Sequence, residues 1–182
     1  MTNHSSSDPE IRLAGAFYVS GKHKLELLRS FADKVAANGW CVGGVVQEVL
    51  RDEDGKAIGL DGIALDTGER FAINRPTKEN RLNKTCSLDI SALADASSAV
   101  DRAIRAGVDL IVIEKFGEQE QQGDGLASDI LHAVSEGIPT LVAVPEAVRD
   151  QWNEFSGRLG QDLGFSASSF SDWWESVKPD RL

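Results

Sequence analysis

The sequence predicts an α/β protein with a mainly parallel sheet and helices on both faces. The first observation is an aliphatic run over residues 110–113 that follows Gly107 and breaks abruptly into charge at Glu114. Such a run is typical of a strand buried on both faces of a parallel sheet. The second is the alternation of short apolar runs with segments whose apolar residues recur at helical spacing. The third is a middle segment, residues 45–73, with the turn spacing of antiparallel hairpins.

Composition places these elements in one domain, expected over residues 11–182, after a polar tail over residues 1–10 that we expect to be disordered. The net charge of −10 argues against nucleic acid or an anionic membrane surface as a partner, because phosphate binding depends on clustered cations. No apolar run approaches the roughly 18 residues of a membrane span, so we expect a cytoplasmic protein without membrane insertion. Cys41 and Cys86 lack the spacing of a zinc site or a disulfide framework.

In the first half of the chain, strands are expected over residues 13–19 and 40–46, the second containing Gly43 and Gly44. The helix between them places apolar residues on one face and ends at a left-handed cap at Asn38 and Gly39. Turns at residues 54–55 and 66–68 divide the antiparallel insert over residues 45–73. Residues 74–85 are expected to be a loop, which holds the only basic cluster: Arg75, Lys78, Arg81 and Lys84.

In the second half, Asp89 or Ser91 caps a helix that buries Leu93, Ala96, Val100 and Ile104. The strand over residues 110–113 follows, then a Gly-rich link, a helix with Leu126, Ile130 and Val134 on one face, and a strand over residues 140–144. The C-terminal segment, residues 145–182, is expected to be helical. Pro145 opens its first helix, and Ser169 with Asp172 forms a capping box for its last.

Candidate site residues gather after the buried strand, where Glu114, Glu118 and Glu120 surround Lys115. Open α/β sheets bind ligands in the crevice outside the carboxyl ends of their strands, so these side chains are predicted to face a ligand. The alternative is a strand that runs into a solvated acidic loop.

A second candidate is the turn Ser20-Gly21-Lys22-His23, between the first strand and the first helix. A helix N-terminus directs free amides and partial positive charge at an anion, and Lys22 adds a full charge. The phosphate-loop pattern GxxxxGK[ST] is only approximated here. The spacing back to Gly15 is one residue too long, and His23 replaces the hydroxyl residue that contacts Mg²⁺.

Over roughly residues 12–145 the order of elements resembles the small, cancer-related type of phosphate-loop nucleoside triphosphatases. Within that neighbourhood the chain is similar to a bacterial family of unknown function associated with molybdenum-transport genes. The motifs that carry the resemblance are Cys86-Ser-Leu-Asp89, Phe116-Gly-Glu-Gln-Glu120 and Gly137-Ile-Pro139. The resemblance implies a degenerate phosphate-loop fold, since Glu114 stands where those enzymes place a metal-binding Asp, and Lys115 where they place the catalytic Glu.

Three functional hypotheses follow. The first is a pseudo-NTPase whose crevice binds a small anion, either a nucleotide or an oxyanion such as molybdate, or a partner's loop. By resemblance it would serve molybdenum uptake or molybdoenzyme supply. The second is an active nucleoside triphosphatase with unusual metal ligands, and the third is a protein-binding adaptor that takes no small ligand. Cys86 is a candidate nucleophile or soft ligand, although an isolated Cys is more often packed as an apolar residue. The sequence identifies neither the metal nor the oligomeric state.

If the turn at residues 20–23 and the loop at residues 114–120 follow neighbouring strands, an anion is expected between them. Lys22 and Lys115 must then outweigh Glu114, Glu118 and Glu120, so the opposing expectation is a metal ion or a partner's Arg held by the glutamates.

Overall fold

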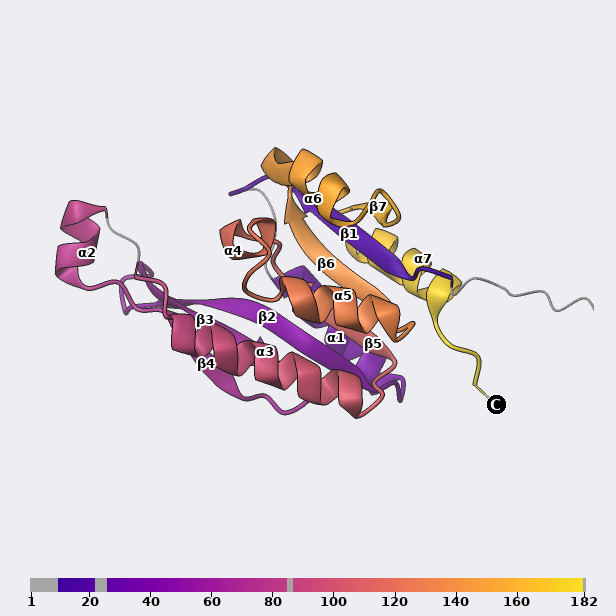
Figure 1. Ribbon diagram of the computed structural model, residues 1–182. Coiled ribbons are helices and arrows are strands. Elements are labelled where there is room, and N and C mark those ends of the chain that lie inside the picture. The colour runs from indigo at the N-terminus through magenta and orange to yellow at the C-terminus, as the bar shows by residue number, and fades with distance from the viewer. Residues whose placement is uncertain (1–9, 22–25, 85–86, 182) are drawn as a thin grey trace, which may run out of the picture.

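A seven-stranded sheet forms the centre of the structure, a computed structural model that describes residues 10–21, 26–84 and 87–181. The strand order is β4-β3-β2-β5-β6-β1-β7 (Figure 1). The strands are β1 (Leu13–Tyr18), β2 (Val42–Arg51), β3 (Ala57–Ala64), β4 (Arg70–Asn74), β5 (Leu110–Glu114), β6 (Thr140–Pro145) and β7 (Gln161–Gly164). Pairing is parallel from β2 through β5, β6 and β1 to β7, whereas β2, β3 and β4 are antiparallel. The predicted fold class is therefore confirmed, with the antiparallel strands at one edge.

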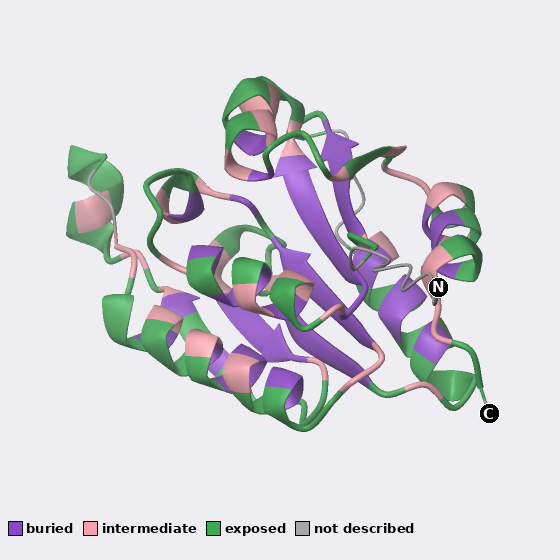
Figure 2. Cartoon of the chain, turned by 45° about the vertical axis from the view of Figure 1, so that its right-hand side comes forward, coloured by how far each residue is buried: buried purple, intermediate pink, exposed green. Residues whose placement is uncertain are grey.

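Helices cover both faces of the sheet. They are α1 (Glu26–Ala37), α2 (Lys78–Asn83), α3 (Ile90–Arg105), α4 (Glu118–Gln121), α5 (Ala127–Ser135), α6 (Arg149–Phe155) and α7 (Ala167–Val177), with a 3₁₀ turn, η1 (Glu146–Val148), before α6. One core lies under α3 and α5, and the other lies under α1 and α7. Figure 2 shows the strands buried between helices that expose their outer sides to solvent.

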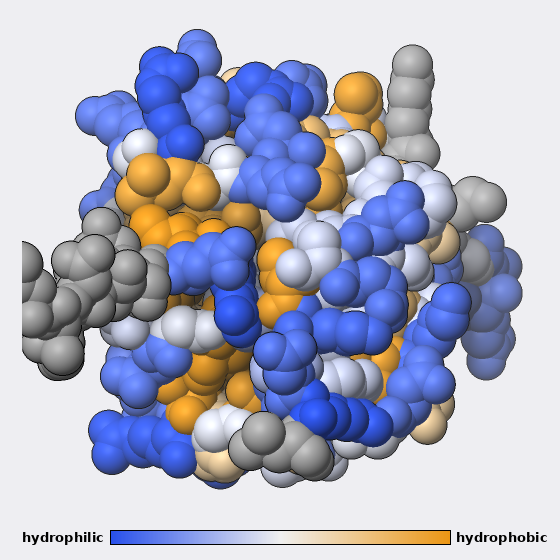
Figure 3. Space-filling model, turned by 90° about the vertical axis from the view of Figure 1, so that its right-hand side faces the viewer, coloured by the Kyte–Doolittle hydropathy of each residue, from blue (hydrophilic) through white to orange (hydrophobic). Residues whose placement is uncertain are grey.

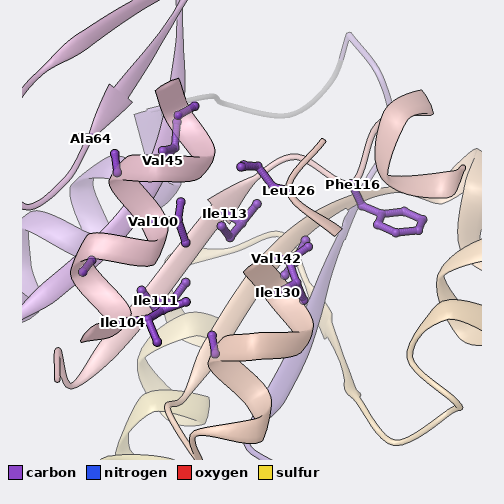
Figure 4. Close-up of a cluster of buried hydrophobic side chains, with 14 of the residues drawn as sticks. Val45, Ala64, Val100, Ile104, Ile111, Ile113, Phe116, Leu126, Ile130 and Val142 are labelled. Atoms are coloured by element: carbon purple, nitrogen blue, oxygen red, sulfur yellow. The ribbon is translucent and has the colours of Figure 1, made fainter. Parts of the chain in front are cut away.

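The first of these cores arises from the apolar stripes that the sequence predicts. Ala96, Val100 and Ile104 of α3 are buried in the same core as Ile111 and Ile113 of β5, which have no exposed area (Figure 4). Phe116 points away from that group, and its ring meets the Trp152 ring of α6 at 5.3 Å and 81°. Edge-to-face contact of this kind adds stability beyond the burial itself. The ring pair therefore fixes the segment that follows β5 against α6.

The strand β2 differs from its expected form. Residues 40–46 and 45–50 were predicted as a strand and the start of an insert, but Val42–Arg51 is one continuous strand. Both neighbours of β2 meet it at Val45, which pairs with Ile113 of β5 on one side and with Ala64 of β3 on the other. Gly44 has a φ of +114°, and a Cβ there would overlap the carbonyl oxygen of Val112. The glycine allows β2 to approach β5 closely at the point where its neighbours change.

Three other predicted elements need correction. Residues 74–85 contain the helix α2, which a capping box between Thr77 and Asn80 closes locally. The segment expected to be helical throughout, residues 145–182, contains β7, and Pro145 ends β6 while α6 begins at Arg149. The last helix begins at Ala167 behind the N-cap Ser166, whose hydroxyl accepts from the amide of Ser169, so the predicted capping box of Ser169 and Asp172 is wrong.

The expected tail over residues 1–10 lies almost entirely outside the described residues. Figure 3 views the end of the molecule that carries the C-terminal residues, where hydrophilic side chains are interspersed with apolar ones. Within the described ranges, no helix is both long enough and apolar enough to cross a membrane.

Candidate functional site

The predicted site residues lie along the edge of the sheet formed by the carboxyl ends of the parallel strands. Ser20 and Gly21 follow β1 and are exposed, and Gly21 has a φ of +79°, which favours glycine. Lys22 and His23 lie outside the described residues. The strands β1 and β5 are not neighbours, because β6 lies between them. At about 4.8 Å per strand, the two ends are separated by roughly 10 Å along the edge.

The chain after β5 stays attached to β6. Glu114 pairs with Ala143 of β6, and the amide of Phe116 donates to the carbonyl of Ala143 at 2.8 Å. Lys115, which lies between these two residues, is exposed. The peptide bond between Glu114 and Lys115 is cis.

Glu114 is a buried carboxyl group at this edge, only 3% exposed. Its Oε2 accepts a hydrogen bond of 2.9 Å from the backbone amide of Gln47 in β2. Burial raises the pKa of Glu114 to about 7, while the Gln47 amide and the Lys115 charge act in the opposite direction. Near neutral pH the group therefore lies close to the midpoint of its titration.

Tyr18, the last residue of β1, shares this environment. Burial raises the pKa of Tyr18 to about 12, and the charge of Glu114 contributes in the same direction. The two side chains lie on the same face of the sheet. Tyr18 belongs to the core under α1 and α7, as do Leu110 and Val112 of β5. Because side chains two residues apart on a strand point to the same face, Glu114 follows Val112 on that face. Tyr18 at the end of β1 therefore lies close enough to Glu114 at the end of β5 for the two groups to interact, although β6 separates the two strands.

The three glutamates of the acidic loop have different roles. Glu118 is exposed at the start of α4. Glu120 is buried, its Oε2 accepts from the amide of Gly117 at 2.9 Å, and its Oε1 accepts from the amide of Leu126 at 3.0 Å. A Cβ at Gly125 would overlap this carboxylate. Glu120 therefore holds the loop closed, and both of its oxygens already have backbone donors.

A cavity of about 280 Å³ lies beside Glu114, on the side away from β1. We call it the edge pocket. Its apolar lining comes from the antiparallel strands, α3 and the start of α5: Val45, Leu60, Ile73, Leu88, Leu93, Ala96 and Leu126. Its polar lining consists of Gln47, Asn74, Glu114, Lys115, Gly117, Glu118, Gln119 and Glu120. Such a combination of an apolar floor and convergent polar groups is typical of a binding site.

Sequence reasoning missed the edge pocket, because its lining comes from segments that only the sheet pairing brings together. The one available signal was the cluster of apolar residues at the ends of the predicted hairpins. Cys86 lies outside the described residues. Its neighbour Ser87 donates through its hydroxyl to the Asn74 side chain at the rim of the pocket.

The donor set at the edge does not suit Mg²⁺. One oxygen of Glu114 is already used by the Gln47 amide, and the raised pKa leaves the group partly protonated at neutral pH. A magnesium site uses ionised carboxylates and nearly ideal octahedral geometry. Within the described ranges, no three His, Cys, Asp or Glu side chains are grouped closely enough to hold a metal ion.

The parallel sheet, the glycine turn after its first strand and the buried acidic residue that ends β5 define a phosphate-loop NTPase-like protein. A solved structure supports this class: a human cancer-related nucleoside triphosphatase matches with a TM-score of 0.69 at 17% identity, covering 94% of this chain and 100% of the other. The chain belongs to the family described as "Protein of unknown function (DUF2478)", whose model matches residues 13–173. The family predicted from the sequence is thus confirmed.

Two curated relatives carry functional names. Over 170 residues the chain is 38% identical to "Molybdenum import ATP-binding protein ModC 2" of Bradyrhizobium diazoefficiens, a match that covers 93% of this chain and 19% of that protein. The chain therefore spans about a fifth of ModC 2. Over 111 residues it is 22% identical to "Nucleoside-triphosphatase THEP1" of Methanopyrus kandleri, which covers 61% of each protein.

Proposed function

We propose that this domain is a pseudo-NTPase that binds a small oxyanion or nucleotide phosphate at the carboxyl edge of its sheet and does not hydrolyse nucleotides efficiently. The observation that carries the proposal is Glu114, which occupies the strand end where the resembling enzymes hold their metal. It is buried, accepts from the Gln47 amide and has a raised pKa. A group in this state stabilises a metal ion poorly, and its partial neutrality weakens its repulsion of an anion.

The cations available to the anion are Lys22, in the turn before α1, and Lys115, exposed beside Glu114. Hydrogen bonds from the amides of Gly117 and Leu126 hold the Glu120 carboxylate inside the loop, so Glu114 and the exposed Glu118 are the carboxylates that can face a ligand directly. The partial neutrality of Glu114 reduces the negative charge that Lys22 and Lys115 must outweigh. The name of the ModC 2 relative supports a role in molybdenum import, with molybdate among the candidate anions.

Phosphate release from ATP and GTP, measured with and without Mg²⁺, tests the loss of hydrolysis. We expect rates far below the roughly 1–1,000 per second of typical enzymes. Turnover of about 1 per second that required Mg²⁺ and disappeared in Lys22→Ala would contradict the proposal and favour the active nucleoside triphosphatase.

Calorimetric titration with molybdate, sulfate and ATP tests binding. Replacing one charged contact typically weakens affinity about 10-fold, so Lys22→Ala and Lys115→Ala should each do so. Lys34→Ala, in the last turn of α1, is the matched control and should bind as the wild type does. Anion binding that survives both edge substitutions would place the site elsewhere.

A further inference from the structure

The segment of residues 75–84, which we call the basic arm, stands apart from the rest of the protein. It contains α2, which projects beyond the sheet in both views (Figures 1 and 2) and has no buried residue. Leu82 at its end is 83% exposed, and Ile90, beyond its root at the start of α3, is 77% exposed. Of the large apolar side chains in the described part of the chain, these two are the most exposed.

The charge of the basic arm is opposite to that of the whole protein. Arg75 is paired with Asp61, but Lys78, Arg81 and Lys84 make no ion pair with any residue whose placement is described. The only carboxylate in the arm is Glu79, whereas the chain carries a net charge of −10. The arm therefore presents an apolar tip surrounded by cations, a surface that fits an apolar cavity with an acidic rim.

The edge pocket has that chemistry. Its floor includes Val45, Ile73 and Leu93, and its polar lining carries more carboxyl groups than cations, because Glu114, Glu118 and Glu120 line it against Lys115 alone. The volume of about 280 Å³ exceeds that of a leucine side chain. A large exposed apolar residue and an apolar cavity on the same molecule form two halves of a contact between copies.

The root of the arm fixes how two copies would meet. Asn74 and Leu88, on either side of the arm, pair as an antiparallel bridge, and both line the edge pocket. The base of the arm thus adjoins the edge pocket. A twofold dimer requires this arrangement, because each copy must offer both halves of the contact within one self-complementary patch.

We propose that two copies of this chain form a twofold dimer in which the basic arm of each docks on the other's edge pocket, with Leu82 in the cavity and Lys78 and Arg81 facing Glu118. The dimer goes beyond the proposed anion binding and does not depend on it.

Sedimentation velocity over a concentration series tests the dimer. Burying one leucine side chain is worth roughly 10- to 100-fold in affinity, so Leu82→Asp should raise the dissociation constant by at least that factor. Since Leu82 is 83% exposed, the variant should keep the wild-type circular dichroism spectrum. The matched control is Leu131→Asp, because Leu131 is 50% exposed on α5 and lies outside the pocket; this variant should remain dimeric.

Charge reversal supplies a second, independent readout. Lys78→Glu with Arg81→Glu should weaken the dimer, Glu118→Lys should also weaken it, and the three changes together should restore part of the affinity. A wild-type protein that sediments as a monomer would overturn the proposal in favour of a different, acidic partner for the arm. A dimer that persists in Leu82→Asp, or charge effects without mutual compensation, would overturn it as well.

Discussion

Glu114 determines which chemistry the edge of the sheet can support. Its carboxyl group is 3% exposed, and burial raises its pKa to about 7. A carboxylate that binds Mg²⁺ must be ionised at neutral pH, whereas this one exchanges between two protonation states there. The neighbouring Lys115 stabilises the ionised form, and Gln47 donates to it. The charge of the site therefore changes with pH near neutrality, in a range where the candidate ligands remain anionic.

Replacing this residue should alter the pH dependence of stability. A Glu with an unfolded pKa near 4.5 and a folded pKa of about 7 binds more protons in the folded state between these values, so stability falls as pH rises through that window. Glu114→Gln removes the titrating carboxyl group and with it this loss of stability at higher pH. We expect little effect at pH 4.5 and stabilisation of up to roughly 3 kcal/mol at pH 8.

Urea denaturation at both pH values measures the difference. An equal change at pH 4.5 and pH 8 would show that Glu114 does not titrate in this window. Glu118→Gln, an exposed neighbour in the same loop, is the control and should leave the pH profile unchanged.

Glu120 has the carboxylate expected of a ligand-binding residue, but its role is structural. Removing its carboxylate in Glu120→Ala leaves the amides of Gly117 and Leu126 without their acceptor. Each buried unsatisfied donor costs about 1–3 kcal/mol, so we expect the two donors together to cost roughly 2–6 kcal/mol in denaturant unfolding. Glu118→Ala should change stability by less than about 0.5 kcal/mol. Equal effects of the two substitutions would contradict the assigned role.

At the scale of elements, the sequence predicts those that have strong periodic patterns. The strands β1, β5 and β6 are continuous apolar runs, and α3 carries a regular stripe of buried residues, so each was recognised. The strand β7 has the sequence Gln-Asp-Leu-Gly and pairs only with β1, so neither alternation nor an apolar run marks it. The helix α2 buries nothing and depends on its capping box, so the hydrophobic pattern could not reveal it.

The glycine pair in β2 provides a test of the element that joins both parts of the sheet. A Cβ in Gly44→Ala would overlap the Val112 backbone, and φ of +114° is unfavourable for alanine. We expect a loss of more than about 4 kcal/mol or failure to fold.

Gly55→Ala isolates the conformational part of this cost. Gly55 lies in the turn between β2 and β3 with φ of +78°, and a Cβ there meets nothing within 4 Å. Thermal unfolding should show a loss of about 1–2 kcal/mol, the usual cost of a left-handed conformation. A similar loss in both variants would mean that close approach of β2 to β5 contributes nothing.

At the scale of the whole molecule, the sequence predicts which edge of the sheet carries the candidate site residues but cannot give their arrangement. The carboxyl ends of parallel strands share an edge, so Ser20, Gly21 and Glu114 were expected there together. The strand order was not predictable, and β6 separates β1 from β5. The edge pocket depends on side chains from β2, β3, β4 and α3, which only the completed sheet assembles.

The position of β1 also determines when the sheet can be completed during synthesis. Its two neighbours are β6 and β7, which begin at Thr140 and Gln161, so the first strand emerges from the ribosome more than a hundred residues before either partner. At about 5–20 residues per second, that delay lasts roughly 6–24 seconds. Throughout it, the apolar segment Leu-Ala-Gly-Ala-Phe-Tyr has unpaired backbone groups on both sides. Nascent chains of this protein therefore offer chaperones a target at β1 until β6 and β7 have been synthesised.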